Sequence, residues 1–91
     1  MDIATTPTGT LRYWAAAKTA AATAEEPYRA RTLAEALTHA RSRHADAPRF
    51  AEVLGYCSFV VDGRPVGDRD HRTILLSDRG TVEALPPFAG G

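Results

Sequence analysis

The sequence contains only one cysteine, and its charges favour neither sign. Cys57 has no second thiol with which to form an internal disulfide, and one thiol cannot hold a metal centre alone. This shortage of ligands excludes an iron–sulfur ferredoxin. The 11 basic and 11 acidic side chains cancel, so no sequence-wide field attracts nucleic acid or an anionic membrane. We therefore expect neither as a partner.

Long apolar runs are missing as well. The longest run is far too short to cross a bilayer, and residues 1–7 lack the basic and apolar segments of a secretion signal. We therefore expect a cytoplasmic protein. The 91 residues suffice for one small domain with little core to spare.

Side chains that could perform catalysis are few and scattered. Cys57 is at the head of an apolar strand, where a small core residue is expected. His39 falls on the polar side of a predicted helix, four residues after Glu35, with which it can pair. His71 lies in a charged loop with no second set of metal ligands nearby. The sequence therefore predicts neither an enzyme nor a metal site.

The best helix signal begins at Thr32. Thr32 can cap the first turn while Glu35 reaches back to it, as in a capping box. Apolar residues then recur on one face of a 3.6-residue repeat, and the pattern ends before Pro48. The members of this face are Leu33, Ala36, Leu37, Ala40 and His44. We expect this helix to lie on a sheet.

Several shorter segments surround this helix. An Ala-rich helix or turn is predicted over 15–24, and a helical turn over 50–54 that Gly55 stops. Residues rich in strand formers predict strands at 10–14, 26–30, 57–62 and 81–85, with 57–62 as a central strand. Asp62–Gly63 predicts a turn into 64–66. The segment 73–76 reads as buried, between a charged loop at 67–72 and a turn at 77–80.

Together these elements predict an α+β domain of one sheet and one main helix over residues 9–85. The small, polar residues 1–8 are expected to form a disordered lead-in.

The last six residues predict a tail that leaves this domain. Pro86 and Pro87 fix φ and remove two backbone donors, so the preceding strand cannot continue through them. Gly90 and Gly91 have no Cβ, and a glycine pair can lie extended in a tunnel too narrow for other residues. We expect the Gly91 carboxylate to be presented to the active site of another protein.

The segment Leu85-Pro-Pro-Phe-Ala-Gly-Gly91 resembles the terminal signature of the MoaD/ThiS sulfur carriers. The similarity extends over most of the chain from about Gly9, including Leu11-Arg-Tyr-Trp-Ala-Ala16 and Phe59-Val-Val-Asp-Gly63. The resemblance implies a β-grasp (ubiquitin-like) fold, with one mixed sheet packed on one main helix and a flexible C-terminal tail.

The resemblance also implies a chemistry for the tail. In the family, a ubiquitin-activating-type adenylyltransferase uses ATP to adenylate the terminal carboxylate, and sulfur then displaces AMP to leave a thiocarboxylate. Gly91 would be this covalent site, while the residues threaded into the partner would be Pro86, Pro87, Phe88, Ala89 and Gly90. The carrier itself would bind no cofactor. The implied sulfur acceptor is the large subunit of molybdopterin synthase, which makes molybdopterin biosynthesis the expected pathway.

A docking surface for these partners is implied by position. Trp14, Pro65 and Val66 occupy positions that match the family's hydrophobic docking patch, and Leu85 is expected to join them. If Val82 and Ala84 of the last strand face the helix, Leu85 faces outward just before the tail. The alternative for Trp14 is a place in the core of this small domain.

The chain departs from the family pattern in two places. Many members have a Gly-Asp-Glu-Val-like turn where residues 78–82 stand. Many also have Arg where this chain has Lys18, so a bidentate ion pair there would be lost or replaced by a point-charge contact. Alternative functions are a carrier for thiamin, cysteine or a sulfur-containing secondary metabolite, a ubiquitin-like modifier joined by Gly91 to lysines, and an interaction domain with an inert tail.

Overall fold

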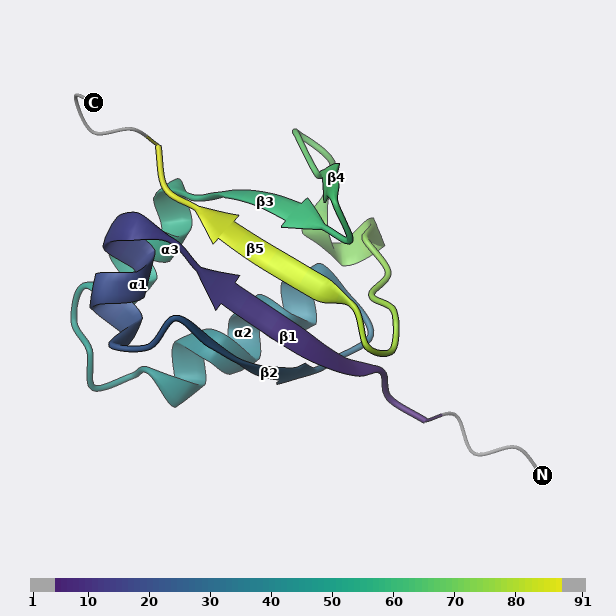
Figure 1. The fold of residues 1–91 in the computed structure, drawn as a ribbon, viewed down its shortest axis with the longest axis horizontal. Helices are drawn as coiled ribbons and strands as arrows, with labels where there is room; N and C mark the ends of the chain where they lie inside the picture. Colours follow the sequence, from purple (N-terminus) through teal and green to yellow (C-terminus); the bar gives the residue numbers. More distant parts are fainter. Residues whose placement is uncertain (1–4, 88–91) are drawn as a thin grey trace.

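A computed structural model describes residues 5–87, and Phe88, Ala89, Gly90 and Gly91 lie outside the described part, as do residues 1–4. Five strands form one mixed sheet in the order β2-β1-β5-β3-β4 (Figure 1). β1 (Thr8–Tyr13) runs parallel to β5 (Thr81–Leu85) and antiparallel to β2 (Glu25–Arg29). β3 (Ser58–Val61) pairs antiparallel with β5 and with β4 (Arg64–Pro65). The predicted mixed sheet is confirmed, and β3 lies between β5 and β4, as expected of a central strand.

The N-terminal end of the domain lies slightly earlier than expected. β1 begins at Thr8, and the carbonyl of Pro7 accepts a hydrogen bond from the backbone N–H of Ala30 at 3.0 Å. Residues 7 and 8, which the sequence assigned to a disordered lead-in, are therefore part of the folded sheet region.

Helix α2 (Leu33–Arg43) is the predicted main helix, and its apolar face is buried as expected. The Thr32 hydroxyl caps it by accepting from the Glu35 N–H at 3.1 Å. The carboxylate of Glu35 accepts from the N–H of Arg31 at 2.7 Å and not from Thr32. Glu35 thus reaches the N–H one residue before the predicted one, and the two donors satisfied are the N–H groups of Glu35 and Arg31.

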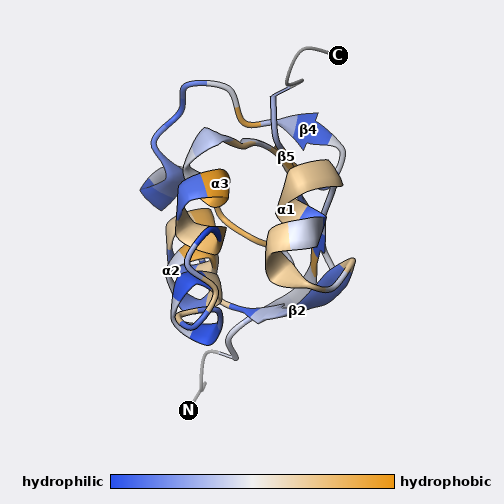
Figure 2. Ribbon diagram, turned by 90° about the vertical axis from the view of Figure 1, so that its left-hand side faces the viewer, coloured by the Kyte–Doolittle hydropathy of each residue, from blue (hydrophilic) through white to orange (hydrophobic). Residues whose placement is uncertain are grey.

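Two short helices complete the helical layer. α1 (Ala15–Ala21) confirms the Ala-rich helix, and Figure 2 shows it apolar over most of its length. α3 (Phe50–Tyr56) passes through Gly55, so the prediction that this glycine ends the helix is wrong. A glycine lowers helix stability by about 1 kcal/mol, which the burial of Phe50, Val53 and Leu54 outweighs. No helix within residues 5–87 is long and apolar enough to cross a bilayer.

The connections after β3 agree with the sequence in one place and differ in another. Asp62 and Gly63 both have positive φ, 51° and 81°, as the tight turn predicted between β3 and β4 requires. A 3₁₀ turn, η1 (His71–Thr73), follows in the charged loop. Ile74 and Leu76 are buried, whereas Leu75 is 76% exposed. The expectation that all of 73–76 is buried is therefore wrong.

Candidate functional site

The end of β5 brings the first residues of the tail next to the end of β1. Tyr13 pairs with Ala84 in the parallel ladder, and the backbone N–H of Trp14 donates to the Ala84 carbonyl at 3.2 Å. On the other side of β5, Leu85 pairs with Ser58. Trp14 and Leu85 thus lie at the same end of the sheet, where the chain leaves it (Figure 1).

The two sides of β5 differ in the way the sequence predicts. Val82 and Ala84 are fully buried under the helices, while Glu83 and Leu85 are half-buried on the opposite, open face of the sheet. This alternation is the period of two that a strand imposes. Leu85 is therefore outward-facing immediately before Pro86, as expected.

Trp14 lies on the surface and not in the core. Its side chain is 46% exposed, and its extended backbone, with φ −118° and ψ 151°, continues the alternation of β1 to the side of Arg12. The indole borders a small hollow of about 210 Å³ that Lys18 and Glu25 also line. The sequence alternative that places Trp14 in the core is wrong.

Val66 does not belong to the docking surface. It is 2% exposed, and its N–H donates to the Phe59 carbonyl at 2.9 Å, so the chain turns inward directly after β4. Pro65 is exposed and pairs with Val60 of β3. Side chains of cross-strand partners project to the same face of a sheet, so Val60 lies beside Pro65 on the open face. Val60 therefore replaces Val66 in the expected docking surface.

We define the docking patch as the four apolar residues Trp14, Val60, Pro65 and Leu85. The alternation of Phe59, Val60 and Val61 in the predicted strand is the signal that identifies Val60, since Phe59 and Val61 are buried and Val60 is not. Tyr56 was also missed. It is 65% exposed at the end of α3, two residues before the Ser58 that pairs with Leu85.

A polar strip borders the docking patch on the open face. Arg12 lies between Glu25 and Glu83 in the strand registers, and its Nε is 3.3 Å from a carboxylate oxygen of Glu25. The Arg12 and Glu25 side chains are about half exposed, so this pair contributes little stability. An apolar centre with a polar border is typical of a protein-binding surface.

The other candidate side chains do not form a reactive group. Burial raises the pKa of the Cys57 thiol to about 11, and the thiol donates to the Val53 carbonyl at 3.4 Å. A thiol with a raised pKa is a poor nucleophile near neutral pH. The ring of His71 packs edge-on against Phe59, with centroids 5.3 Å apart. Within residues 5–87, no three His, Cys, Asp or Glu side chains are grouped so that they could hold a metal ion.

Comparison with solved structures assigns the fold. A solution structure of the small archaeal modifier protein 1 from Methanosarcina acetivorans superposes with a TM-score of 0.79 and 19% identity, covering 97% of this chain and all of that one. The predicted β-grasp, ubiquitin-like fold is therefore confirmed. A scan against protein-family models gives no match, and no curated protein sequence matches either.

Two further neighbours are subunits of molybdopterin-converting factors. The putative subunit 1 from Pyrococcus furiosus has a TM-score of 0.69 at 24% identity, covering 89% of this chain and 98% of that one. In a complex of subunits 1 and 2 from Helicobacter pylori, the matching chain has a TM-score of 0.62 at 21% identity, with coverages of 92% and 99%. The structural neighbours thus include ubiquitin-like proteins of the kind that the tail sequence resembles.

Proposed function

We propose that this protein is a sulfur carrier of the MoaD/ThiS type whose Gly91 carboxylate becomes a thiocarboxylate. The observation that carries the proposal is the end of β5 in a β-grasp domain, where Leu85 and Pro86 lie beside the exposed Trp14 and are followed in the sequence by Pro-Phe-Ala-Gly-Gly. Among the described residues no other reactive group competes with this terminus.

The chemistry requires activation by a partner. A carboxylate is a poor acyl donor because it repels nucleophiles and has no good leaving group. Attack of the Gly91 oxygen on the α-phosphorus of ATP releases pyrophosphate and gives an acyl-adenylate. A sulfur nucleophile then forms the C–S bond as the bond to AMP breaks. The adenylating enzyme holds the nucleotide, and this chain supplies the carboxylate on a tether without side chains at Gly90 and Gly91.

The docking patch would bind both partners in turn. The complex of subunits 1 and 2 of the molybdopterin-converting factor supports a larger, sulfur-accepting subunit as one of them. Molybdopterin biosynthesis is thus the pathway that we propose. Exposed apolar side chains next to a reactive terminus would hold the domain while the tail enters the active site.

Intact-mass spectrometry tests the proposal. The protein is incubated with a cognate adenylating enzyme, ATP and a sulfur donor. We expect a gain equal to the replacement of one oxygen by sulfur, located at Gly91 by fragmentation and retained in Cys57→Ala. Gly90→Val is expected to block the gain, because a side chain obstructs a passage sized for backbone. Sulfur on Cys57 that survives deletion of Gly91 would contradict the proposal.

A second candidate function is that of a ubiquitin-like modifier, joined through Gly91 to lysines of other proteins. The similarity to the small archaeal modifier protein 1 favours this candidate. Ladders of higher-mass conjugates that disappear when Gly91 is deleted would support the modifier. Detection of only the free protein and its sulfur-substituted form, with no conjugates, would support the carrier.

A further inference from the structure

A groove of about 530 Å³ lies at the end of the sheet opposite the tail. One wall comes from the β3–β4 hairpin, and the other comes from the extended segment that follows η1. The side chains of the two walls are Val61, Asp62 and Arg64 on the hairpin and Thr73, Leu75 and Ser77 on the segment. Its volume lies in the range of ligand-binding clefts.

The segment is held along one edge only. Leu33 donates its N–H to the Ile74 carbonyl at 2.9 Å, and Leu76 donates to the Arg31 carbonyl at 2.9 Å. These two bonds flank the antiparallel bridge between Thr32 and Leu75. In such a pair the N–H and C=O of Leu75 point away from Thr32. No hydrogen bond uses either group within residues 5–87.

Leu75 therefore offers a short free strand edge together with an exposed side chain. It is 76% exposed, whereas its neighbours Ile74 and Leu76 are 8% and 6% exposed. Extended peptides commonly add to such an edge, where main-chain hydrogen bonds give affinity and alternate side chains give specificity. An aliphatic side chain of the added peptide would cover Leu75.

The groove also carries a fixed positive charge. Arg69 donates from Nε to the Val66 carbonyl at 3.0 Å and from Nη2 to the Pro65 carbonyl at 2.9 Å. Neutral carbonyls hold this guanidinium in place without cancelling its charge. Arg64 lines the same groove, and neither arginine takes part in an ion pair in the described part of the chain.

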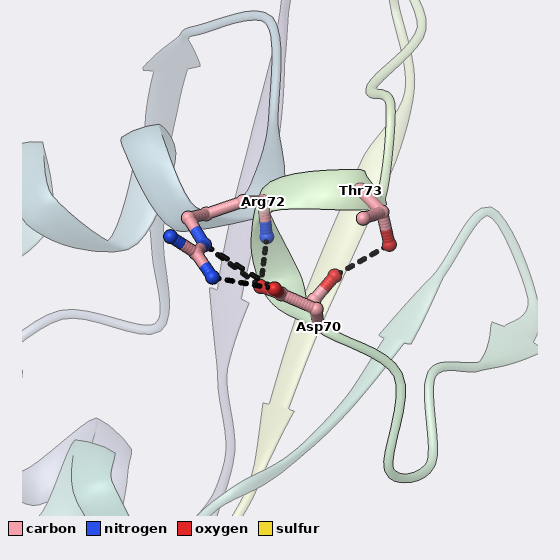
Figure 3. Close-up of polar contacts among 3 residues, drawn as sticks. All are labelled: Asp70, Arg72 and Thr73. Atoms are coloured by element: carbon pink, nitrogen blue, oxygen red, sulfur yellow. Dashed lines mark hydrogen bonds and ion pairs between the residues drawn. The ribbon is translucent and has the colours of Figure 1, made fainter.

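The nearby carboxylates are already engaged. Figure 3 shows Asp70 turned toward Arg72, with Nη2 of Arg72 2.8 Å from Asp70 Oδ2 and the Arg72 N–H donating to Oδ1 at 2.9 Å. Asp62 accepts from the Ser77 hydroxyl and from the Thr81 N–H, both at 2.8 Å. Neither acid pairs with Arg64 or Arg69. Asp62 also lines the groove and its partners are neutral, so it leaves one negative charge beside the two arginines, and the net positive charge can attract an external carboxylate.

We propose that this groove binds an extended acidic segment of a protein partner, with main-chain bonds to Leu75, carboxylates on Arg64 and Arg69, and an aliphatic side chain over Leu75. This surface adjoins the docking patch at Pro65, whose carbonyl accepts from Arg69, but it lies at the opposite end of the sheet from Trp14 and Leu85. The proposal is independent of the chemistry at Gly91. A partner could occupy it while the tail is engaged elsewhere.

NMR titration of the full chain with the synthetic peptide Asp-Leu-Asp-Leu-Asp tests the proposal. We expect amide shifts confined to residues 61–77, with the Leu75 amide among them. Arg69→Gln is expected to weaken binding about tenfold, the usual effect of losing a charge-assisted contact. Leu75→Ser is also expected to weaken binding, and both variants remain folded because these side chains are exposed.

Arg41→Gln is the matched control, since it removes one exposed guanidinium on α2, away from the groove. It is expected to bind the peptide as the wild type does. Equal weakening by Arg41→Gln and Arg69→Gln would overturn the proposal, as would equal binding of Lys-Leu-Lys-Leu-Lys. Inorganic phosphate that causes the same amide shifts, with an affinity equal to that of the peptide, would show that the groove binds free anions. That result would also overturn the proposal.

Discussion

Glu26 connects side chains from three parts of the fold. Its carboxylate accepts a hydrogen bond from the Tyr13 hydroxyl, lies 2.8 Å from Nε2 of His44, and is 3.4 Å from Nη1 of Arg43. The side chain of Glu26 is 11% exposed. The His44 ring stacks on Phe50 with centroids 4.3 Å apart. A nearly buried carboxylate with these partners ties α2 to the sheet.

The environment of Glu26 predicts a contribution to acid sensitivity. Burial raises the pKa of this carboxyl, but hydrogen bonds from Tyr13 and His44 and the nearby cations lower it by more, so the net pKa lies below 4.5. The unfolded chain therefore binds a proton more readily than the folded one. The stabilisation is present above pH 4.5 and is lost as the pH falls through the folded-state pKa.

Urea denaturation between pH 7 and pH 3 measures this contribution. Glu26→Gln is expected to cost about 1–2 kcal/mol at pH 7 and to show a shallower fall of the unfolding free energy at acid pH. Tyr13→Phe, which removes one of the bonds that lower the pKa, is expected to be intermediate in slope. An unchanged acid slope in Glu26→Gln would exclude this role.

Close packing of β1 against Gly80 and Tyr28 requires glycine at position 9. A Cβ at this position would overlap the Gly80 carbonyl oxygen and the ring of Tyr28. Gly9→Ala is therefore expected to destabilise the domain by about 1–3 kcal/mol. Gly55→Ala is the control, because a Cβ there meets nothing within 4 Å and alanine favours helix. Thermal denaturation should give opposite shifts in Tm, and a loss of stability in both variants would contradict the packing argument.

At the scale of elements, the cap of α2 is the clearest local interaction. Because the Thr32 hydroxyl satisfies the Glu35 N–H, Thr32→Ala is expected to cost about 1 kcal/mol of unfolding free energy. Thr38→Ala is the matched control on the same helix, where the threonine hydroxyl only bonds back to the Ala34 carbonyl. Chemical denaturation distinguishes the two. Equal losses of unfolding free energy in the two variants would show that the cap at Thr32 makes no special contribution to stability.

Elements with strong local signals could be predicted from the sequence. Thr32 marked the start of α2, Asp62–Gly63 marked the turn after β3, and alternation in the last strand placed Val82 inside and Leu85 outside. Each of these signals depends on residues within a few positions of one another. This is why short-range physics suffices for them.

Features that depend on distant contacts could not be predicted in this way. Val66 is buried because it bonds back to Phe59 and turns under the sheet, and Leu75 is exposed because its segment is held at one edge by residues 31–33. The partners of Glu26 are up to 18 positions away in the sequence. Composition and periodicity carry no information about such contacts.

At the scale of the whole molecule, the two ends of the sheet present different surfaces. One end carries Trp14 and Leu85 of the docking patch, while the opposite end carries the groove with Arg64 and Arg69, which Pro65 of the patch adjoins. β5 connects the two ends through the middle of the sheet. Substitutions of Trp14 or Leu85 are therefore expected to leave the groove unchanged, and substitutions of Leu75 are expected to leave the Leu85 end unchanged, which allows the two surfaces to be tested separately.

Trp14 allows docking to be separated from folding. It is the N-cap of α1 and makes no capping bond with its side chain, and aspartate is among the preferred residues there. Trp14→Asp is expected to leave the domain folded with an unfolding free energy lower by about 1–3 kcal/mol, because a new cap offsets only part of the loss of the buried half of the indole. Binding to the adenylating enzyme should nevertheless weaken by about 2 kcal/mol, roughly 30-fold, because an interface anchor is lost.

Leu85→Asp should weaken the same binding to a similar degree, whereas Leu75→Asp, an equally polar change at the opposite end of the sheet, should not. Calorimetric titration gives the affinities, and circular dichroism with urea denaturation gives the stabilities. If Trp14→Asp unfolds the domain, the buried half of the indole is essential to packing, and Leu85→Asp alone tests the docking patch. If Leu75→Asp weakens binding as much as Leu85→Asp, the enzyme contacts both ends of the sheet and the docking patch is not the surface that selects it.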